Sequence, residues 1–470
     1  MLSNLQKSTN SSAKGDGAAV VTAAVSEAAD AGLAMFNKGG NAFDAALAAA
    51  FAETVWLPMK CGLAGDIVAL YKRPGEPVRT LLAIGRGPLA LTQGAALAAT
   101  GPCSIGGAGA PEGYARLAAY GDLPFKTLLE PAIRMAQDGV KWTPVAVRLT
   151  EESEALLRQW NGDIPYLPNG KLPEVGADLH LPGLAKLLQA FGTEQGRLFH
   201  GKIGEEIVSH VNDLEGMLQR DDMIRAVATE MPCDRTVVND TATLYTTPHP
   251  THGVVHAQAL KSTLGGLSET QALLQAQDAF GSGATGGTSV VTAADSKGNR
   301  GVLVHSNSFP RYGAGVVVPE YDLVLNNRPG RGFAQGVGPD HWNAPSPLSI
   351  PATTLNAWFL DTVGSEFWGG TPGGVNQAVW NLQATHALLQ GHDPQAAIDA
   401  PKWGLSPSGD ILWESDHAQR DGTQKSIEPH GHRSALQIIE ILKATGAMRA
   451  GVDPRTNADA RFQSSQTDPQ

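Results

Sequence analysis

The sequence has few cysteines, no long hydrophobic run and no apolar leader. Its three cysteines, Cys61, Cys103 and Cys233, lie far apart and form no C-x-x-C pair, which excludes a disulfide framework and indicates a reducing compartment. No stretch reaches the roughly eighteen apolar residues that a membrane-spanning helix requires. The N-terminal segment MLSNLQKSTNSSAKGDG is polar and lacks the apolar core of a signal peptide. We therefore expect a cytoplasmic protein that does not contact a membrane.

Basic residues are also outnumbered by acidic ones, with 35 lysines and arginines against 46 aspartates and glutamates. The formal net charge is −11 at pH 7 and the pI is about 5.6. Nucleic acids and anionic membranes bind basic surfaces, so we expect neither as a partner. What is present, 470 residues with 42% hydrophobic content, is enough for a sizeable core, in up to about three domains or in one large α/β body.

Helical patterns dominate the first half of the chain. Residues 18–51 are extremely rich in alanine, the strongest helix former, and predict two helices broken at residues 39–41. Asn41 or Asp44 can cap the second helix. Strands are expected at residues 67–71 and 80–84. Further helices are expected at residues 114–120, 124–138, 150–159, 182–191 and 202–213.

The second half mixes strand and helix patterns. A strand is expected over residues 236–246 and a helix over residues 254–264. A later helix is expected to end near Leu389, and another to cover residues 434–445. Shorter strand-like runs lie at residues 312–318, 322–327 and 411–413, and we expect disordered tails at residues 1–17 and 463–470.

The stretch GSGATGGTSVVTAADSKGNRGVLVHSN, residues 281–307, is where the sequence points to chemistry. A glycine-rich tether runs into a Thr-Ser pair that opens a strand, and a turn over residues 296–299 leads into a second strand. A threonine in this position, behind Gly287, is where an N-terminal nucleophile hydrolase would cut itself. The cut would free Thr288, whose α-amine can act as the base for its own hydroxyl. An ordinary hairpin behind a loop gives the same pattern, so both interpretations stand.

Two further patterns are candidates for a site. Arg86 lies between glycines at the end of an expected strand, where its guanidinium could hold a carboxylate through two hydrogen bonds. A solvated surface arginine would give the same pattern. Gly373 and Gly374 precede an expected helix, where consecutive amide groups could stabilise an oxyanion. An ordinary turn would also need such glycines.

No metal or organic cofactor is indicated. His249, His252 and His256 do not have the spacing of a metal-ligand set, and no neighbouring acid or cysteine completes one. The glycine-rich run at residues 106–113 lacks both the G-x-G-x-x-G spacing and the Lys-Ser/Thr pair of a phosphate loop. We therefore expect neither a metal site nor a nucleotide site.

Several separated stretches together resemble the gamma-glutamyltransferase family of N-terminal nucleophile (Ntn) hydrolases. GGNAFDAALAAA is similar to the family's G-G-N-A-x-D-A-A segment, and LPMKCGLAGD stands where the family has P-x-x-S-G-x-G-G. TSVVTAADSKGN lies without gaps on the nucleophile strand T-T-x-x-x-x-x-D-x-x-G-N, and PEGYARLAAYGDLPF, GTPGG and AGVDPR match as well. The resemblance runs from about Ala18 to Ala460. It implies a four-layer αββα sandwich in a single large domain.

The resemblance also implies a zymogen that cuts itself between Gly287 and Thr288. Residues 18–287 would form the large-subunit part and residues 288–462 the small-subunit part, and the processed halves would stay associated. Thr285 is an alternative nucleophile that requires a three-residue insertion later in the strand.

Individual roles carry over by position. Thr288 resembles the nucleophile, Ser306 stands at the threonine that supports it, and Gly373 and Gly374 match the oxyanion-hole glycines. Arg86 matches the arginine that holds the substrate's α-carboxylate.

The substrate-binding positions depart from the family. Asn307 lies beside the family's substrate-binding asparagine, and Arg328 belongs to the basic loop of residues 328–333. The family's aspartate that reads the α-amino group of glutamate falls at Arg331, which inverts the charge. The family's serine pair falls in APSPLSIP, where at least one hydroxyl is lost. Because an ammonium facing Arg331 would be repelled, we predict a small-molecule substrate with one or two carboxylates and no free amine at that place.

Three functions follow from these residues. The first is hydrolysis of an amide whose acyl group ends in a carboxylate, as in acylases of this family. The second is cleavage of a carbon–carbon bond beside a keto acid, as in the family members of alkylproline antibiotic pathways. The third is a non-enzymatic binding homologue that does not cut itself, which the short segment before Thr288 suggests. The sequence does not identify the natural substrate, whether transfer to a second substrate competes with hydrolysis, or whether the protein forms a homodimer.

Overall fold

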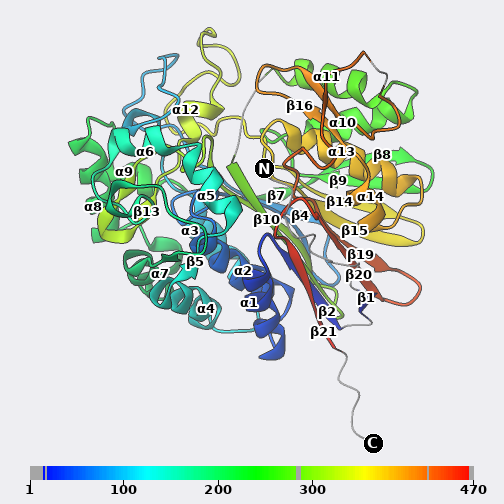
Figure 1. The fold of residues 1–470 in the computed structure, drawn as a ribbon, viewed down its shortest axis with the longest axis horizontal. Coiled ribbons are helices and arrows are strands. Elements are labelled where there is room, and N and C mark those ends of the chain that lie inside the picture. The colour runs from blue at the N-terminus through cyan, green and yellow to red at the C-terminus, as the bar shows by residue number, and fades with distance from the viewer. Residues whose placement is uncertain (1–13, 16–17, 282–286, 421–422, 465–470) are drawn as a thin grey trace, which may run out of the picture.

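Two seven-stranded antiparallel sheets pack face to face at the centre of the molecule, and helices cover both outer faces (Figure 1). The computed structural model describes residues 14–15, 18–281, 287–420 and 423–464. The first sheet has the order β21 (Asp459–Gln463), β2 (Ala19–Ala23), β10 (Gly287–Asp295), β11 (Arg300–Ser308), β3 (Asp66–Lys72), β4 (Arg79–Ala83) and β7 (Thr229–Pro232). The second has the order β1 (Lys14–Gly15), β20 (Met448–Val452), β19 (Gln437–Leu442), β15 (Ser365–Gly370), β14 (Ala357–Thr362), β9 (Ala242–Thr246) and β8 (Asp234–Asn239).

The helices form two outer layers. The first sheet is covered by α1 (Ser26–Asn37) and α2 (Ala42–Trp56); α4 (Phe125–Asp138) packs on the outside of α2, and α7 (Pro182–Glu194) packs on α4. The second is covered by α10 (Gly253–Leu264), α11 (Glu269–Phe280), α13 (Asn376–Leu389) and α14 (Pro394–Asp399). The remaining helices are α3 (Ala110–Ala118), α5 (Pro144–Glu151), α6 (Glu154–Trp160), α8 (Lys202–Asp213), α9 (Arg220–Ile224) and α12 (Arg328–Gly332). Short strand pairs join β5 (Val140–Lys141) to β6 (Asp178–Leu179), β12 (Val317–Val318) to β13 (Leu323–Val324), and β17 (Ile411–Glu414) to both β16 (Trp403–Leu405) and β18 (Ser426–Ile427).

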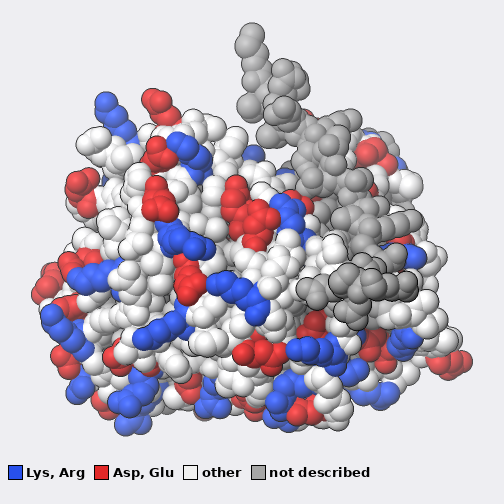
Figure 2. Space-filling view, turned by 90° about the horizontal axis from the view of Figure 1, so that it is seen from below, with Lys and Arg blue, Asp and Glu red and all other residues white. Residues whose placement is uncertain are grey.

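Three buried apolar clusters hold these layers together. One lies between the first sheet and its helices, one between the two sheets, and one between the second sheet and its helices. The result is the expected four-layer αββα sandwich. On the face seen in Figure 2, basic and acidic side chains are interspersed. No helix among the described residues is both long enough and apolar enough to cross a membrane.

Alanine explains why α2 fits inside the first helical layer. All of its residues except the last are buried, and small side chains let α1 approach closely, since a Cβ at Gly32 would lie 2.9 Å from the carbonyl oxygen of Ala45. The helix begins as predicted. The Asn41 side chain accepts from the backbone N–H of Phe43 at 2.8 Å, and Asp44 accepts from the N–H of Asn41 at 2.8 Å.

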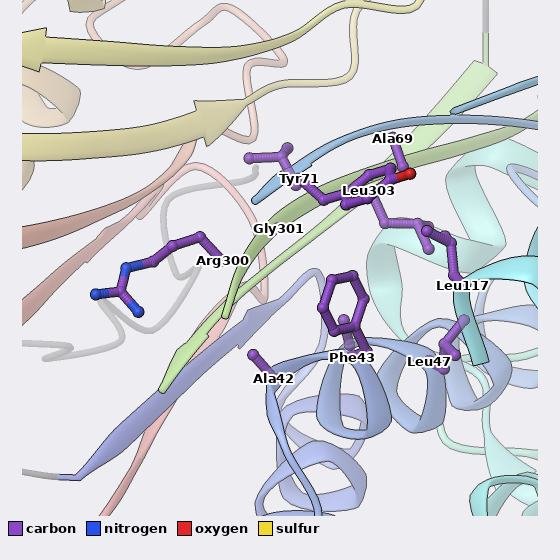
Figure 3. Close-up of a pocket in the computed structure, with 11 residues that line it drawn as sticks. Ala42, Phe43, Leu47, Ala69, Tyr71, Leu117, Arg300, Gly301 and Leu303 are labelled. Atoms are coloured by element: carbon purple, nitrogen blue, oxygen red, sulfur yellow. The ribbon is translucent and has the colours of Figure 1, made fainter. Parts of the chain in front are cut away.

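A small apolar cavity remains between α2 and the strands β3 and β11 (Figure 3). Phe43, Leu47 and Tyr71 line it together with Gly301. A Cβ at Gly301 would meet only Tyr71 Cβ at 3.8 Å and a carbonyl oxygen at 4.0 Å, both ordinary contacts. The cavity therefore has room for at least one methyl group.

Two predicted helices are wrong in part or in whole. Residues 18–51 do contain two helices, but they begin with β2, because the β-branched run from Val20 to Thr22 pairs with β10. Residues 434–445 contain the strand β19 in place of a helix. Its apolar run is buried along nearly all its length, and such a run has no periodicity that separates strand from helix.

Smaller differences concern breaks between elements. The helix expected over residues 150–159 is divided between α5 and α6, and the strand expected over residues 236–246 is the hairpin β8–β9. The basic loop of residues 328–333 forms the short helix α12. Within the expected N-terminal tail, Lys14 and Gly15 form β1.

Candidate active site

Thr288 lies fully buried near the start of β10, between the two sheets. Gly287 pairs with Ser308 and Ser289 with His305, so the register shifts at Thr288. The Thr288 hydroxyl donates to Ser306 Oγ at 3.5 Å. The Ser306 hydroxyl in turn donates to the carbonyl oxygen of Gly287, and its Oγ accepts from the Ser308 N–H at 2.9 Å. The structure thus joins the predicted nucleophile, its supporting hydroxyl and the carbonyl of the predicted cleavage site.

Gln377, which the sequence did not single out, also contacts the nucleophile. One end of its side-chain amide lies 3.3 Å from the hydroxyls of both Thr288 and Thr354. The other end lies 3.2 Å from the carbonyl oxygen of Thr371 and 3.1 Å from that of Thr354. Because carbonyl oxygens can only accept, the NH₂ group must face them. Oε1 therefore faces the two hydroxyls as an acceptor, so Gln377 Oε1 at 3.3 Å and Ser306 Oγ at 3.5 Å share the single hydroxyl hydrogen of Thr288. The reverse orientation would set Oε1 against two acceptors.

Gly373 and Gly374 form the loop directly before α13. Their φ angles are +142° and +60°, a region that glycine adopts without a steric penalty, and a Cβ at Gly373 would lie 2.4 Å from the Trp380 ring. Their carbonyl oxygens accept from the N–H groups of Asn376 and Gln377 at 3.1 and 2.9 Å. Within the described part of the chain, neither glycine uses its own N–H in a hydrogen bond. Two donors are therefore available one helical turn from the residue that contacts Thr288.

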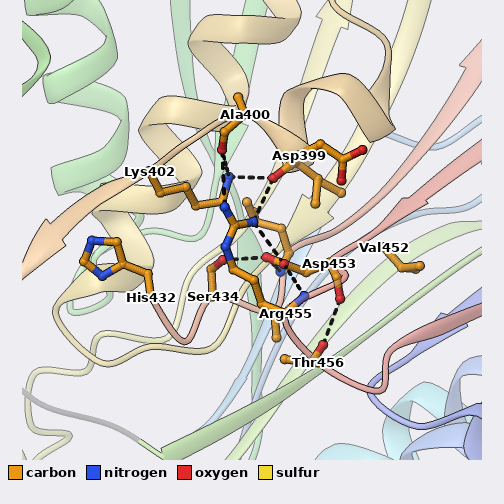
Figure 4. A network of polar contacts seen from close by, with 12 residues as sticks. Asp399, Ala400, Lys402, His432, Ser434, Val452, Asp453, Arg455 and Thr456 are labelled. Atoms are coloured by element: carbon orange, nitrogen blue, oxygen red, sulfur yellow. Dashed lines mark hydrogen bonds and ion pairs between the residues drawn. The ribbon is translucent and has the colours of Figure 1, made fainter. Parts of the chain in front are cut away.

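A buried ion network braces this glycine loop. Thr371 Oγ1 accepts from the Ala435 N–H at 3.2 Å, and Asp453 accepts from the neighbouring Leu436 N–H at 3.3 Å. Asp453 pairs with Arg455 at 3.2 Å, and Arg455 reaches Glu414 at 2.8 Å. Figure 4 shows Arg455 between Asp453 and the backbone at Ala400. The AGVDPR stretch therefore positions the loop and does not reach the nucleophile itself.

The three candidate arginines differ in what they contact. Arg86 is partly buried, and its Nη1 and Nη2 donate to the carbonyl oxygens of Leu348 and Val227 at 3.2 and 3.5 Å. The Arg331 guanidinium lies 5.3 Å from the centre of the Phe309 ring, next to the end of β11. Burial lowers the pKa of both arginines. Arg328 is fully buried and donates through Nε to Asp66 at 2.7 Å.

Asn307 faces away from the nucleophile. Its backbone N–H donates to the Lys60 carbonyl at 2.8 Å and its side-chain amide to the Pro58 carbonyl at 3.1 Å. Successive strand residues point to opposite faces, so Asn307 points to the face opposite Ser306. The observed contact is with the loop before β3, and the expected substrate-binding role of Asn307 stays a prediction.

His249, His252 and His256, which the sequence did not predict to bind a metal, each make a contact with a neighbouring side chain. His256 is fully buried, its Nε2 bonds the Thr385 hydroxyl at 2.9 Å, and burial lowers its pKa to about 3. His249 packs against the ring of Trp342 with 4.4 Å between centroids. His252 packs against Phe280.

A different cluster, Glu53, Cys61 and His305, brings potential metal ligands within 4.8 Å of one another. Its geometry fits a hydrogen-bond network better than a metal centre. Glu53 lies 2.6 Å from His305 Nε2, whereas two oxygen or nitrogen ligands of a tetrahedral zinc ion are about 3.3 Å apart. His305 Nδ1 bonds the Tyr114 hydroxyl at 2.8 Å. Burial raises the pKa of the Cys61 thiol well above its usual value, which disfavours the thiolate that a metal needs.

Two face-to-face antiparallel sheets between helical layers form the αββα sandwich of the N-terminal nucleophile hydrolase fold. The sequence model described as gamma-glutamyltranspeptidase matches residues 28–277 and 266–464. The chain belongs to this family, as its sequence resemblance predicted.

Relatives differ in how much of their length is shared. The oxamate amidohydrolase proenzyme of Klebsiella pneumoniae is 24% identical over 92% of this chain and 96% of its own. Glutathione hydrolase 3 of Arabidopsis thaliana is 27% identical over 43% of this chain, and the match spans only 33% of that protein. The crystal structure of cephalosporin acylase from Bacillus halodurans superimposes with a TM-score of 0.84 at 24% identity, covering 98% of each chain. That likeness confirms the fold.

The alternative nucleophile Thr285 lies outside the described residues. Gln377 could have been noticed in the sequence only from its place behind the glycine loop, since a lone glutamine carries no motif. The structure is what joins it to Thr288.

Proposed function

We propose that this protein is a self-processing hydrolase that uses Thr288 to cleave an amide in a small molecule bearing a carboxylate. One observation carries the proposal: the Ser306 hydroxyl contacts both the Thr288 hydroxyl and the Gly287 carbonyl oxygen, and Gln377 contacts the Thr288 hydroxyl. Family membership supports a hydrolase. Relatives whose names specify an amidohydrolase and an acylase share nearly the whole chain.

Self-processing would begin at the peptide bond before Thr288. Thr288 Oγ attacks the Gly287 carbonyl carbon, and the C–N bond breaks as the hydroxyl proton passes to the departing α-amine. The Ser306 hydroxyl, which already donates to this carbonyl, stabilises the oxyanion that forms. Water then hydrolyses the resulting ester, which leaves a carboxyl group on Gly287 and a free N-terminus on Thr288.

The mature enzyme would use the same hydroxyl on a substrate. The Thr288 α-amine takes the proton from Oγ while Gln377 Oε1 orients the hydroxyl, and Oγ attacks the amide carbonyl carbon. The N–H groups of Gly373 and Gly374 hold the oxyanion, and the protonated α-amine gives its proton to the leaving amine. Water, deprotonated by the α-amine, then hydrolyses the acyl-enzyme and restores the threonine. None of these steps uses a metal or an organic cofactor.

Strand order supports halves that stay associated. β10 and β11, from the part after the cut, lie between β2 and β3, from the part before it. Carbon–carbon cleavage beside a keto acid is the alternative chemistry for the same nucleophile. Cytoplasmic location and a possible homodimer stay expectations.

Intact mass spectrometry of the purified protein tests the proposal. We expect two fragments that meet between Gly287 and Thr288, one uncut chain for Thr288→Ala, and cutting retained in Thr288→Ser. N-terminal sequencing of the smaller fragment separates Thr288 from Thr285. A wild-type chain that stays full-length after long incubation would refute self-processing and favour a binding protein.

A further inference from the structure

Arg328 is buried in a way that calls for an acceptor. Its side chain is fully buried at the start of α12, and Nε donates to Asp66 Oδ2 at 2.7 Å. Among the described residues, neither Nη1 nor Nη2 has a hydrogen-bond partner. A buried charged donor without an acceptor is costly, and native proteins seldom keep one without a functional reason.

Asp66 places this guanidinium two strands from the nucleophile, on the same face of the sheet. Asp66 in β3 is the register partner of Ser306 in β11, and side chains that are directly opposite lie on the same face of a sheet. Ser306 contacts Thr288 on that face. The side chains of Thr288, Ser306 and Asp66 therefore follow one another across neighbouring strands, and Arg328 extends from Asp66.

The surroundings of the pair are built to hold it in one orientation. The second oxygen of Asp66 accepts from the Gly85 N–H at 2.7 Å. A Cβ at Gly85 would lie 3.2 Å from Arg328 Cβ and 3.3 Å from Asp66 Oδ1, so the site has little room for a side chain there. Asn326 closes another side, with its amide bonded to the carbonyls of Ala64 and Gly106 at 2.9 and 3.1 Å.

The terminal nitrogens of Arg86, which the family resemblance assigns to the substrate carboxylate, already donate to backbone carbonyls. Arg331 is only partly buried, and its guanidinium lies over an aromatic ring. Arg328 is the candidate whose position is fixed by an aspartate while both outer nitrogens remain unbonded.

We infer that Arg328, oriented by Asp66, binds the carboxylate of the substrate's acyl part through Nη1 and Nη2. The guanidinium fork can bridge two carboxylates, with Asp66 on the Nε side and the substrate on the outer edge. The inference rests on the proposed function. Asp66 lies two strands from Thr288, about 10 Å across the sheet, so a carboxylate held here would lie several bonds from the carbonyl that Thr288 attacks.

A pair of chromogenic amides tests this assignment: glutaryl p-nitroanilide and the same compound with its terminal carboxylate replaced by a carboxamide. In the wild type, kcat/KM should favour the carboxylate by about 100-fold, as expected for a buried bidentate ion pair. Arg328→Lys keeps the charge but not the fork, and should remove most of this preference. Arg300→Lys is a matched control near the far end of β11, where Arg300 pairs with Glu366 at 3.5 Å, and should keep the preference.

Self-processing is measured on every variant, which separates the two proposals. A wild type that never cuts itself defeats the proposed function, whereas an Arg328→Lys enzyme that cuts itself but loses the preference supports the carboxylate site. An Arg328→Lys enzyme that keeps the preference overturns it, as does loss of the preference in Arg86→Lys alone. If Arg328→Lys does not fold, the Asp66→Asn, Arg328→Gln double variant replaces the ion pair with neutral groups of similar size, and the same two outcomes decide.

Discussion

Replacing Ser306 with alanine is expected to slow self-processing by roughly two to three orders of magnitude. The Ser306 Oγ accepts from the Ser308 N–H, which leaves its own hydrogen for the Gly287 carbonyl. Among the described residues, Ser306 is the only one whose side chain donates a hydrogen bond to the Gly287 carbonyl oxygen. Loss of one oxyanion donor typically slows acyl transfer by about 10²–10³, and this variant loses one donor.

The assay follows the full-length chain by intact mass over days after purification. Ser306→Thr should process at a rate near that of the wild type because it keeps the hydroxyl. Ser308→Ala is the matched control: Ser308 lies in the same strand and is equally buried, but its hydroxyl has no partner among the described residues. If Ser306→Ala processes as fast as Ser308→Ala, the Ser306 hydroxyl does not stabilise the oxyanion and the reasoning fails.

Three further predictions concern the nucleophile, the cavity and the ion network. Gln377→Leu should lower kcat on an anilide substrate by about tenfold, because it removes one hydrogen bond to the Thr288 hydroxyl; an unchanged kcat would argue against that contact. Gly301→Ala should raise the free energy of unfolding by about 0.5–1 kcal/mol, because the added methyl enters open space and the unfolded chain loses freedom. Gly313→Ala should lower it, because φ is +53° and a Cβ would lie 2.5 Å from a carbonyl oxygen; thermal unfolding of both variants checks the contrast. Burial raises the Glu414 pKa, but the hydrogen bonds and positive charge of Arg455, together with the backbone N–H groups of Lys402 and His432, hold the pKa below its ordinary value of 4.5. The stability that this carboxylate contributes is therefore complete above pH 4.5 and is lost as the pH falls further, which denaturant unfolding at pH 6 and pH 3.5 would detect.

Local patterns were sufficient where neighbours in sequence decide the structure. The hairpin behind Gly287 and the Asn41 cap depend on residues within a few positions of one another, and both were predictable. β19 was not, because an isoleucine-rich run becomes a strand only when β15 and β20 are available on either side.

The candidate site also combines contacts between residues close in sequence with contacts between residues far apart in sequence. Thr288 and Ser306 lie on adjacent strands of one hairpin, so the sequence could bring them together. Gln377 reaches Thr288 from α13, which covers the other sheet, 89 positions later in the chain. Arg328 meets Asp66 across 262 positions. Contacts of this range depend on the assembled sandwich, and no local pattern contains them.

The position of β10 between strands from both sides of the proposed cut has a consequence for how the protein would unfold. Before cleavage, folding is a first-order process of one chain. After cleavage, neither fragment could complete the first sheet alone, so refolding would require two chains to meet. The midpoint of unfolding would then rise with protein concentration, whereas that of Thr288→Ala would not. Cutting one peptide bond would convert a folding equilibrium into an assembly equilibrium.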